Sequence, residues 1–196
     1  MRRRGLRLPL STLERRLRRR FREQPLSGGD PASVTAAVAA ILVPTPDTIL
    51  LIRRADRSDD PWSGQMALPG GRRNPSDADP RVTAIRETLE EVGVALPDNS
   101  YLGELPDVVP KSVALGNIVV RPYLFILADR PILTANREVA EAGWVRLDVL
   151  KDPEIYRPYT LELYGAERTF PAFHIGSSVV WGLTERILTS LLPLLP

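Results

Sequence analysis

The chain has 196 residues, of which 43% are hydrophobic and 26% are charged. This length suffices for one domain with a real core, and no stretch approaches the roughly 18 consecutive apolar residues of a membrane span. The absence of cysteine excludes disulfides and thiol nucleophiles, and the single histidine, His174, excludes a multi-histidine metal site. Any divalent cation must therefore be held mainly by oxygen, which suits magnesium or manganese, and a cytoplasmic location is expected.

The net charge of +2 conceals an uneven distribution. Residues 1–25 hold ten arginines against two glutamates, a balance of +8, so the remaining residues sum to −6. Within this basic arm Ser11 suits an N-cap, and apolar residues recur at helical spacing from Leu10 to Phe21. We expect an amphipathic helix packed on the domain, with a nucleic-acid or membrane-surface contact and a transit peptide as open alternatives.

The remaining elements follow from apolar periodicity and turn residues. The Gly-, Pro- and Ser-rich stretch 23–33 predicts a linker, which separates a basic N-terminal segment, 1–32, from a domain over 33–196. We expect a hairpin of strands 33–43 and 48–54, a loop over 55–79, a helix over 80–92, a strand within 113–127, a strand and short helix over 143–152, a hairpin over 159–175 and a closing helix over 177–192. The mixture lacks strict strand-helix-strand alternation, which favours an α/β fold with a mixed β-sheet.

The helix over 80–92 has clear end signals. Asp79 suits the N-cap, Pro80 suits the first turn, and Gly93 suits the C-cap. Its helical spacing predicts a buried face made of Val82, Ile85, Leu89 and Val92.

The same helix concentrates negative charge in the stretch RETLEEVGV, residues 86–94. Glu87, Glu90 and Glu91 stand at i, i+3 and i+4, so they share one face and repel each other. Upstream, Pro69-Gly70-Gly71 predicts a tight backbone whose carbonyls can point inward. Three carboxylates and a glycine carbonyl would form a hard oxygen site for a divalent cation; a solvated helix face with incidental glutamates is the alternative.

These residues resemble the Nudix box, G-x5-E-x7-R-E-U-x-E-E-x-G-U, where U is apolar. The matching positions are Gly71, Arg86, Glu87, Glu90, Glu91, Gly93 and Val94. Asp77 fills the first glutamate slot, the interval to Arg86 is one residue longer, and Thr88 takes the first apolar slot. The resemblance implies a Nudix-type α/β/α sandwich and metal-dependent hydrolysis of a diphosphate bond.

The longer interval is also similar to that of the coenzyme A pyrophosphatase branch of the family. The stretches LLIRRA (50–55), LPGG (68–71) and WGLTERIL resemble that branch too, although Ile52 and Leu68 replace its threonine and phenylalanine, and its intervening arginine slot is not filled in register. Over residues 34–192 the resemblance implies hydrolysis of coenzyme A or a derivative to adenosine 3′,5′-bisphosphate and a 4′-phosphopantetheine. ADP-ribose or a nucleoside triphosphate, a nucleic-acid-binding Nudix-fold regulator, and a homodimer remain open.

Residue roles also follow from the resemblance. Mg²⁺ or Mn²⁺ would be held by Glu87, Glu90, Glu91 and the Gly71 carbonyl, with Glu87 and Glu90 also counted as catalytic. Arg86 would orient Glu87 without touching substrate.

Further candidates lie outside the box. Glu138, in REVAEAGW, is the candidate general base, with Glu141 in reserve and a plain surface glutamate as the alternative. His174 is expected to be structural. Substrate-binding candidates are Arg54, Arg72 and Arg73, which could grip phosphates, and Trp62, which could stack on a base or a pantetheine arm.

Overall fold

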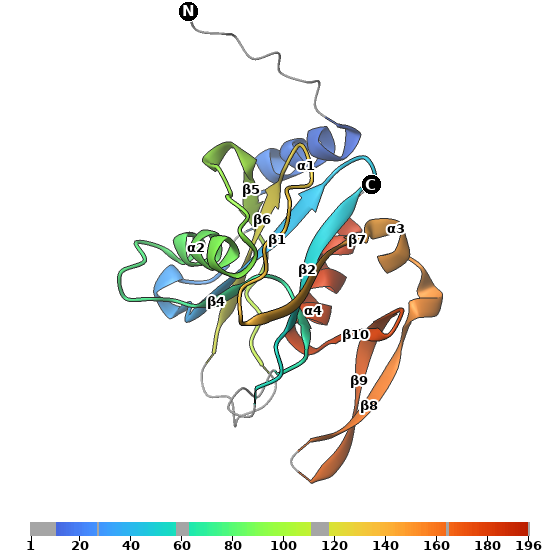
Figure 1. The fold of residues 1–196 in the computed structure, drawn as a ribbon. Coiled ribbons are helices and arrows are strands. Elements are labelled where there is room, and N and C mark those ends of the chain that lie inside the picture. Colours follow the sequence, from blue (N-terminus) through green and yellow to red (C-terminus); the bar gives the residue numbers. More distant parts are fainter. Residues whose placement is uncertain (1–10, 27, 58–62, 111–117, 164, 196) are drawn as a thin grey trace, which may run out of the picture.

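The computed structural model describes residues 11–26, 28–57, 63–110, 118–163 and 165–195. Its centre is a seven-stranded sheet with the order β3-β2-β1-β6-β5, in which β4 pairs with β1 and β7 with β2 (Figure 1). Because β1 is parallel to β6 and antiparallel to β2 and β4, the sheet is mixed, as predicted. The strands are β1 (Ala36–Val43), β2 (Thr48–Arg54), β3 (Met66–Ala67), β4 (Gly70–Arg72), β5 (Tyr101–Glu104), β6 (Val120–Ile126) and β7 (Val139–Arg146).

Strand alternation sends apolar side chains to both faces of this sheet. In β2, Leu50 and Ile52 join the core beneath α2, whereas Ile49 and Leu51 join the core on the opposite face. Helix α2 (Pro80–Val92) covers the first face, while α1 (Thr12–Glu23), α3 (Leu147–Leu150) and α4 (Gly182–Leu191) cover the second (Figure 1). The result is the α/β/α sandwich that the resemblance implied.

Helix α2 has the predicted bounds, but of the four residues predicted for its buried face only Val92 is fully buried. Leu89 is 53% exposed, and Val82 and Ile85 are only partly buried. The helix instead turns small side chains toward β1, which presents Ala37 and Ala39 to it. Its buried residues are Pro80, Thr83, Ala84, Thr88, Glu91 and Val92.

The basic helix α1 packs on the domain, as expected. Ser11 caps it by accepting a hydrogen bond from the Glu14 N–H, and Leu13, Leu17 and Phe21 are buried in the core on the α4 side of the sheet. The arginines of this helix occupy its outer faces, so burial of one face has left a strongly basic surface.

The linker is fastened to the sheet by a buried arginine. Arg121 of β6 donates to the Gly29 carbonyl at 2.6 Å and to Asp107 at 2.7 and 2.9 Å. The Gly28 N–H donates to Glu104. Four short 3₁₀ helices complete the described elements: Pro31–Ser33, Asp98–Ser100, Pro153–Ile155 and Leu192–Leu194.

A second, three-stranded sheet contains β8 (Tyr156–Leu163), β9 (Ala166–Ile175) and β10 (Ser178–Trp181). The predicted hairpin is confirmed as β8–β9, which projects from the body of the domain (Figure 1). The closing helix begins later than predicted, because Ser178–Trp181 pairs with β9 after a turn at Gly176. The predicted loop over 55–79 likewise contains β3 and β4.

Within the described ranges, every helix is too short or too polar to cross a membrane.

Candidate active site

Helix α2 is fixed at both ends by local hydrogen bonds. The Asp79 carboxylate accepts the N–H groups of Arg81 at 2.7 Å and Val82 at 3.2 Å, which satisfies donors that the first turn leaves unpaired. At the other end Gly93 adopts φ 71°, the left-handed conformation that favours glycine. The acids of the last two turns are therefore carried on a rigid element.

The backbone bends at Pro69 and enters β4 at Gly70, and this segment, here called the Gly70-Gly71 turn, lies directly against these acids. Strand β4 pairs with β1 so that Gly71 is opposite Ala37. A Cβ on Gly70 would lie 2.3 Å from the Ala37 carbonyl oxygen, and a Cβ on Gly71 would lie 2.6 Å from the carboxyl carbon of Glu87. Only glycine fits at Gly70, where backbone atoms block a Cβ and φ is 149°, and a side chain on Gly71 would force the Glu87 carboxylate away from the backbone.

Glu91 is the most deeply buried acid of the box, with 3% of its surface exposed. Its carboxylate accepts the Gly70 N–H at 2.8 Å. Burial, together with the charges of Glu87 and Glu138, raises the pKa of Glu91 to about 8, against the opposing effects of the Gly70 hydrogen bond and the charge of Arg54. The site thus contains a carboxylate with too little positive charge nearby to remain readily ionised.

Arg86 holds several acids together. Its guanidinium donates to Glu87 at 2.8 Å, to Glu90 at 3.1 Å and to Asp77 at 3.0 and 3.2 Å. The geometry agrees with the predicted orienting of Glu87. Burial nevertheless raises the pKa of Glu87, with the neighbouring charges of Glu90 and Glu138 adding to the effect.

Asp77 is a residue whose importance the sequence did not reveal. It is 5% exposed and accepts hydrogen bonds from Arg86, from the Thr83 hydroxyl and from the Asn74 N–H. The Arg86 guanidinium holds the pKa of the Asp77 carboxyl well below its usual range. The one available signal was its place in the first glutamate slot of the box.

The described residues contain no group of three or more acidic or histidine side chains already arranged around one metal position. Glu90 is turned to Arg86 and its side chain is 55% exposed, whereas Glu87 and Glu91 lie inward beside the turn. The donor chemistry still fits a hard cation, because Glu87 is close enough for its charge to raise the pKa of Glu91 and both carboxylates adjoin glycine backbone. The metal ligands therefore stay a prediction.

Glu138 and Glu141 have different surroundings. Glu138 precedes β7 and accepts the Ala55 N–H with its carbonyl, and its charge acts on both Glu87 and Glu91. Glu141 is ion-paired with Arg53 at 2.8 Å. The structure thus brings Glu138 toward the box, whereas the reserve candidate, Glu141, is held in an ion pair with Arg53.

The predicted phosphate-binding arginines also separate. Arg54 lies near enough to lower the pKa of Glu91. Arg72 is exposed at the end of β4, and its carbonyl, not its guanidinium, meets Arg86 at 3.4 Å. Arg73 donates to the Pro31 carbonyl of the linker at 3.3 Å. Trp62 falls outside the described residues.

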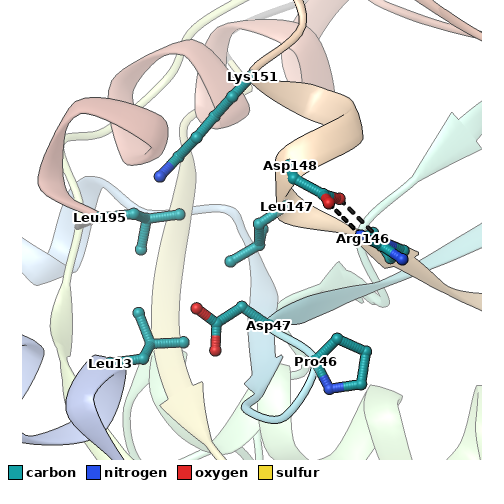
Figure 2. Close-up of a pocket in the computed structure, with 8 residues that line it drawn as sticks. All are labelled: Leu13, Pro46, Asp47, Arg146, Leu147, Asp148, Lys151 and Leu195. Carbon is teal, nitrogen blue, oxygen red and sulfur yellow. Dashed lines mark hydrogen bonds and ion pairs between the residues drawn. The ribbon is translucent and has the colours of Figure 1, made fainter.

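A hollow of about 210 Å³ lies on the opposite face of the sheet from α2 (Figure 2). It has an apolar floor, and the side chains of Arg146 and Asp148 pair with each other at its rim. None of the box acids lines it. Its lining residues are Leu13, Pro46, Asp47, Arg146, Leu147, Asp148, Lys151 and Leu195.

The sandwich, the acid-bearing helix and the glycine turn together define a class of hydrolase that acts on nucleoside diphosphate compounds. A family model described as the NUDIX domain matches residues 34–163. The chain belongs to the Nudix family.

Two curated proteins are also similar in sequence to this chain. A mouse protein described as mitochondrial coenzyme A diphosphatase NUDT8 is 33% identical over 172 residues, covering 84% of this chain and 79% of the relative. A protein from Schizosaccharomyces pombe is 37% identical over 131 residues; these cover 64% of this chain but only 40% of that longer relative.

Among solved structures, a MutT/nudix family protein from Enterococcus faecalis superposes with a TM-score of 0.55 at 21% identity, covering 93% of this chain and 74% of that chain. This similarity supports the fold.

Proposed function

We propose that this Nudix hydrolase cleaves the diphosphate bond of coenzyme A or a derivative, giving adenosine 3′,5′-bisphosphate and a 4′-phosphopantetheine. The observation that carries the chemistry is the excess of carboxylates, Glu87, Glu91 and Glu138, gathered at the Gly70-Gly71 turn. Support for the substrate comes from the similarity to the mouse coenzyme A diphosphatase, which extends over 84% of this chain.

Glu87, Glu90, Glu91 and the Gly71 carbonyl would hold Mg²⁺ or Mn²⁺. When bound, such a cation neutralises charge on the diphosphate and lowers the pKa of a bound water. The carboxylates of Glu87, Glu90 and Glu91 suit this role because their ionised forms, two of them largely removed from water, are destabilised without nearby positive charge. Glu90, the most exposed of them, would have to turn from Arg86 toward its two neighbours.

The other side chains have distinct tasks in this proposal. Arg86, anchored by Asp77, keeps Glu87 in position against Gly71. Glu138 is exposed, and it lies near enough to the box for its charge to raise the pKa of Glu87. It would therefore accept the proton from the attacking water. Arg54 and Arg72 would bind phosphate oxygens by charge-assisted hydrogen bonds.

A panel of substrates tests the proposal. Coenzyme A, dephospho-coenzyme A, ADP-ribose and a nucleoside triphosphate are incubated with the chain at matched magnesium, and products are identified by mass. We expect coenzyme A to be cleaved best, and to be cleaved only at the diphosphate. Preferred cleavage of ADP-ribose or of the triphosphate would refute the coenzyme A assignment and leave the Nudix chemistry standing.

Metal dependence is tested in the same assay. Excess chelator should abolish hydrolysis and added magnesium or manganese should restore it; full activity in chelator would contradict the proposed cation site. The cytoplasmic location and a homodimer also remain proposals; the mouse relative is described as mitochondrial.

A further inference from the structure

The three-stranded sheet has one face that joins the core and one that does not. On the first face Phe173 and Val180 are buried, and the Tyr156 hydroxyl donates to Glu185 of α4 at 2.7 Å. Strand alternation sends the intervening residues to the other side. The cross-strand pairs on that side are Arg157 with Ala172, Tyr159 with Phe170, Leu161 with Arg168, and Trp181 with Ala172.

Four rings form a continuous patch on this second face, here called the ring face: Tyr159, Phe170, His174 and Trp181. The Phe170 and Trp181 centroids are 5.0 Å apart, Tyr159 and Trp181 are 6.3 Å apart, and Tyr159 and His174 are 6.1 Å apart. All four rings are half-buried, and none belongs to the hydrophobic core clusters of the described residues. The patch is therefore an aromatic surface that the fold of the domain does not require.

The charges around the ring face indicate what would cover it. Arg157 and Arg168 share this face and are exposed, and their guanidinium groups form no hydrogen bond or ion pair in the part of the chain that the structure describes. The buried Nε2 of His174 also lacks a hydrogen-bond partner among the described residues. Ring planes, unpaired guanidinium groups and an unsatisfied ring nitrogen together suit a ligand that is aromatic, anionic and rich in hydrogen-bonding groups.

A short segment of the chain links the neighbourhood of β10 to the candidate active site. Strand β10, which carries Trp181, packs beside β3. Met66 of β3 is four residues from Gly70, a stretch that can span at most about 14 Å. The Gly70 N–H in turn donates to Glu91. The short segment from β3 to the start of β4 therefore runs from the neighbour of β10 to the glycines that lie against Glu91.

We propose that the ring face binds the adenosine 3′,5′-bisphosphate half of the substrate, an assignment that rests on the proposed function. The adenine stacks on the rings around Trp181, and Arg157 and Arg168 meet the 3′-phosphate. The pantetheine half carries no charge beyond the diphosphate and would leave both arginines without partners. A second copy of the chain fits less well, because two such faces packed together would oppose arginine with arginine.

The test measures binding to the full chain by titration calorimetry, with adenosine 3′,5′-bisphosphate as the probe. Arg157→Gln combined with Arg168→Gln should weaken binding about tenfold or more, and Trp181→Leu should weaken it by a similar factor. The arginine variant should affect 5′-AMP, which lacks the 3′-phosphate, much less. Arg16→Gln on α1, a matched exposed arginine distant in the fold, should leave binding of both nucleotides unchanged.

Three outcomes would overturn the proposal: unchanged affinity in the arginine variant, equal losses for 5′-AMP and the bisphosphate, or conversion of a dimer to a monomer by Trp181→Leu with unchanged nucleotide affinity. If Trp181→Leu fails to fold, the surface arginine variant still decides. Hydrolysis of the substrate panel is measured separately, so a chain that binds the bisphosphate through this face but cleaves no coenzyme A refutes the proposed function alone. Cleavage of coenzyme A with KM unaltered by the arginine variant refutes the ring-face assignment alone.

Discussion

Two arginines of this domain, the buried Arg121 and the half-buried Arg86, are each surrounded by carboxylates, yet the two clusters differ in electrostatic balance. Arg121, whose side chain is 2% exposed, is matched by Asp107 and more distantly by Glu104, and it also binds the Gly29 carbonyl. The pKa of Asp107 is lowered, chiefly by its hydrogen bond to Arg121. This cluster is closed: its charges satisfy each other, and it joins the linker to the sheet.

The Arg86 cluster contains the same kind of ion pair and, in addition, more negative charge than its arginine offsets. Arg86 and Asp77 form the matched half, with the pKa of Asp77 lowered. Glu87 and Glu91 have raised pKa values, because burial removes water from more negative charge than Arg86 and Arg54 offset. The comparison shows how a structural ion pair differs from a site that needs a ligand: the second has carboxylates left over.

The largest expected effect comes from breaking the closed cluster. Asp107→Asn leaves Arg121 buried without its principal counter-charge, which should lower the free energy of unfolding by about 3–5 kcal/mol. Thermal unfolding at neutral pH measures the change. The matched control is Asp148→Asn, which breaks the ion pair with Arg146. Both side chains are exposed, Arg146 at 59% and Asp148 at 61%, so the loss of stability should be far smaller than for Asp107→Asn. Equal losses in the two variants would show that burial does not distinguish these pairs.

In the open cluster the expected loss is in activity. Glu91→Gln and Glu87→Gln should each lower kcat by roughly 10²–10³-fold, the scale on which one preorganised charge acts in a transition state. Glu90→Gln should act in the same direction and less strongly, since Glu90 is the most exposed of the three. Glu162→Gln, at an exposed position of β8, serves as the control. Folded variants that retain full activity would show that these acids do not take part in hydrolysis.

The same Glu91→Gln variant should gain stability in metal-free buffer, opposite in sign to Asp107→Asn. The pKa of Glu91 is about 8 in the folded chain against the ordinary glutamate value of 4.5, so the folded state binds this proton more tightly than the unfolded state. Wild-type stability should therefore fall as pH rises from about 4.5 to 8 and then level off. Glutamine carries no such proton, so its advantage should be absent near pH 4, grow through that window and reach a few kcal/mol.

Melting temperatures in chelator between pH 5 and 9 measure this difference, and added magnesium should reduce it. Glu162→Gln should show no pH-dependent gain. An advantage for Glu91→Gln that is the same at every pH would contradict the explanation from a buried carboxylate.

The sequence predicted the ends of α2 because those ends depend on neighbours in the chain. Asp79, Pro80 and Gly93 act on the backbone next to them, and the structure has the helix begin and end as they indicate. The orientation of the helix depends on tertiary contacts instead. Leu89 was expected inside, but the close approach of Gly71 to Glu87 and the alanines of β1 turn small residues inward.

The same distinction applies to the site and to the closing helix. The spacing of the acids predicted that Glu87, Glu90 and Glu91 lie near one another, yet not that Glu91 is nearly inaccessible or that Asp77 anchors Arg86. Those facts depend on how β4 packs against α2. The apolar pattern of Ser178–Trp181 suits a helix or a strand. This segment forms strand β10 because it pairs with β9, and local propensity does not encode that tertiary contact.

Helix α1 carries an excess of positive charge, opposite in sign to the excess of the Arg86 cluster. Removing part of this charge should have the smallest effect on catalysis. Its buried face belongs to the core, while Arg16 and Arg22 are exposed and form no hydrogen bond or ion pair among the described residues. If this positive excess meets phosphates, Arg16→Gln with Arg22→Gln should weaken RNA binding at low salt and reduce the salt slope by about one for each lost contact. Hydrolysis should be unchanged, because neither residue lies near the box. Fluorescence anisotropy of a labelled RNA across a salt series measures the slope, with Asp148→Asn as a charge-changing control elsewhere on the surface. If the slope is the same in wild type and variant, the arginines of α1 serve only to keep an otherwise apolar helix in solution. An excess of charge would then indicate a ligand in this molecule only where the charged groups are buried, as in the Arg86 cluster.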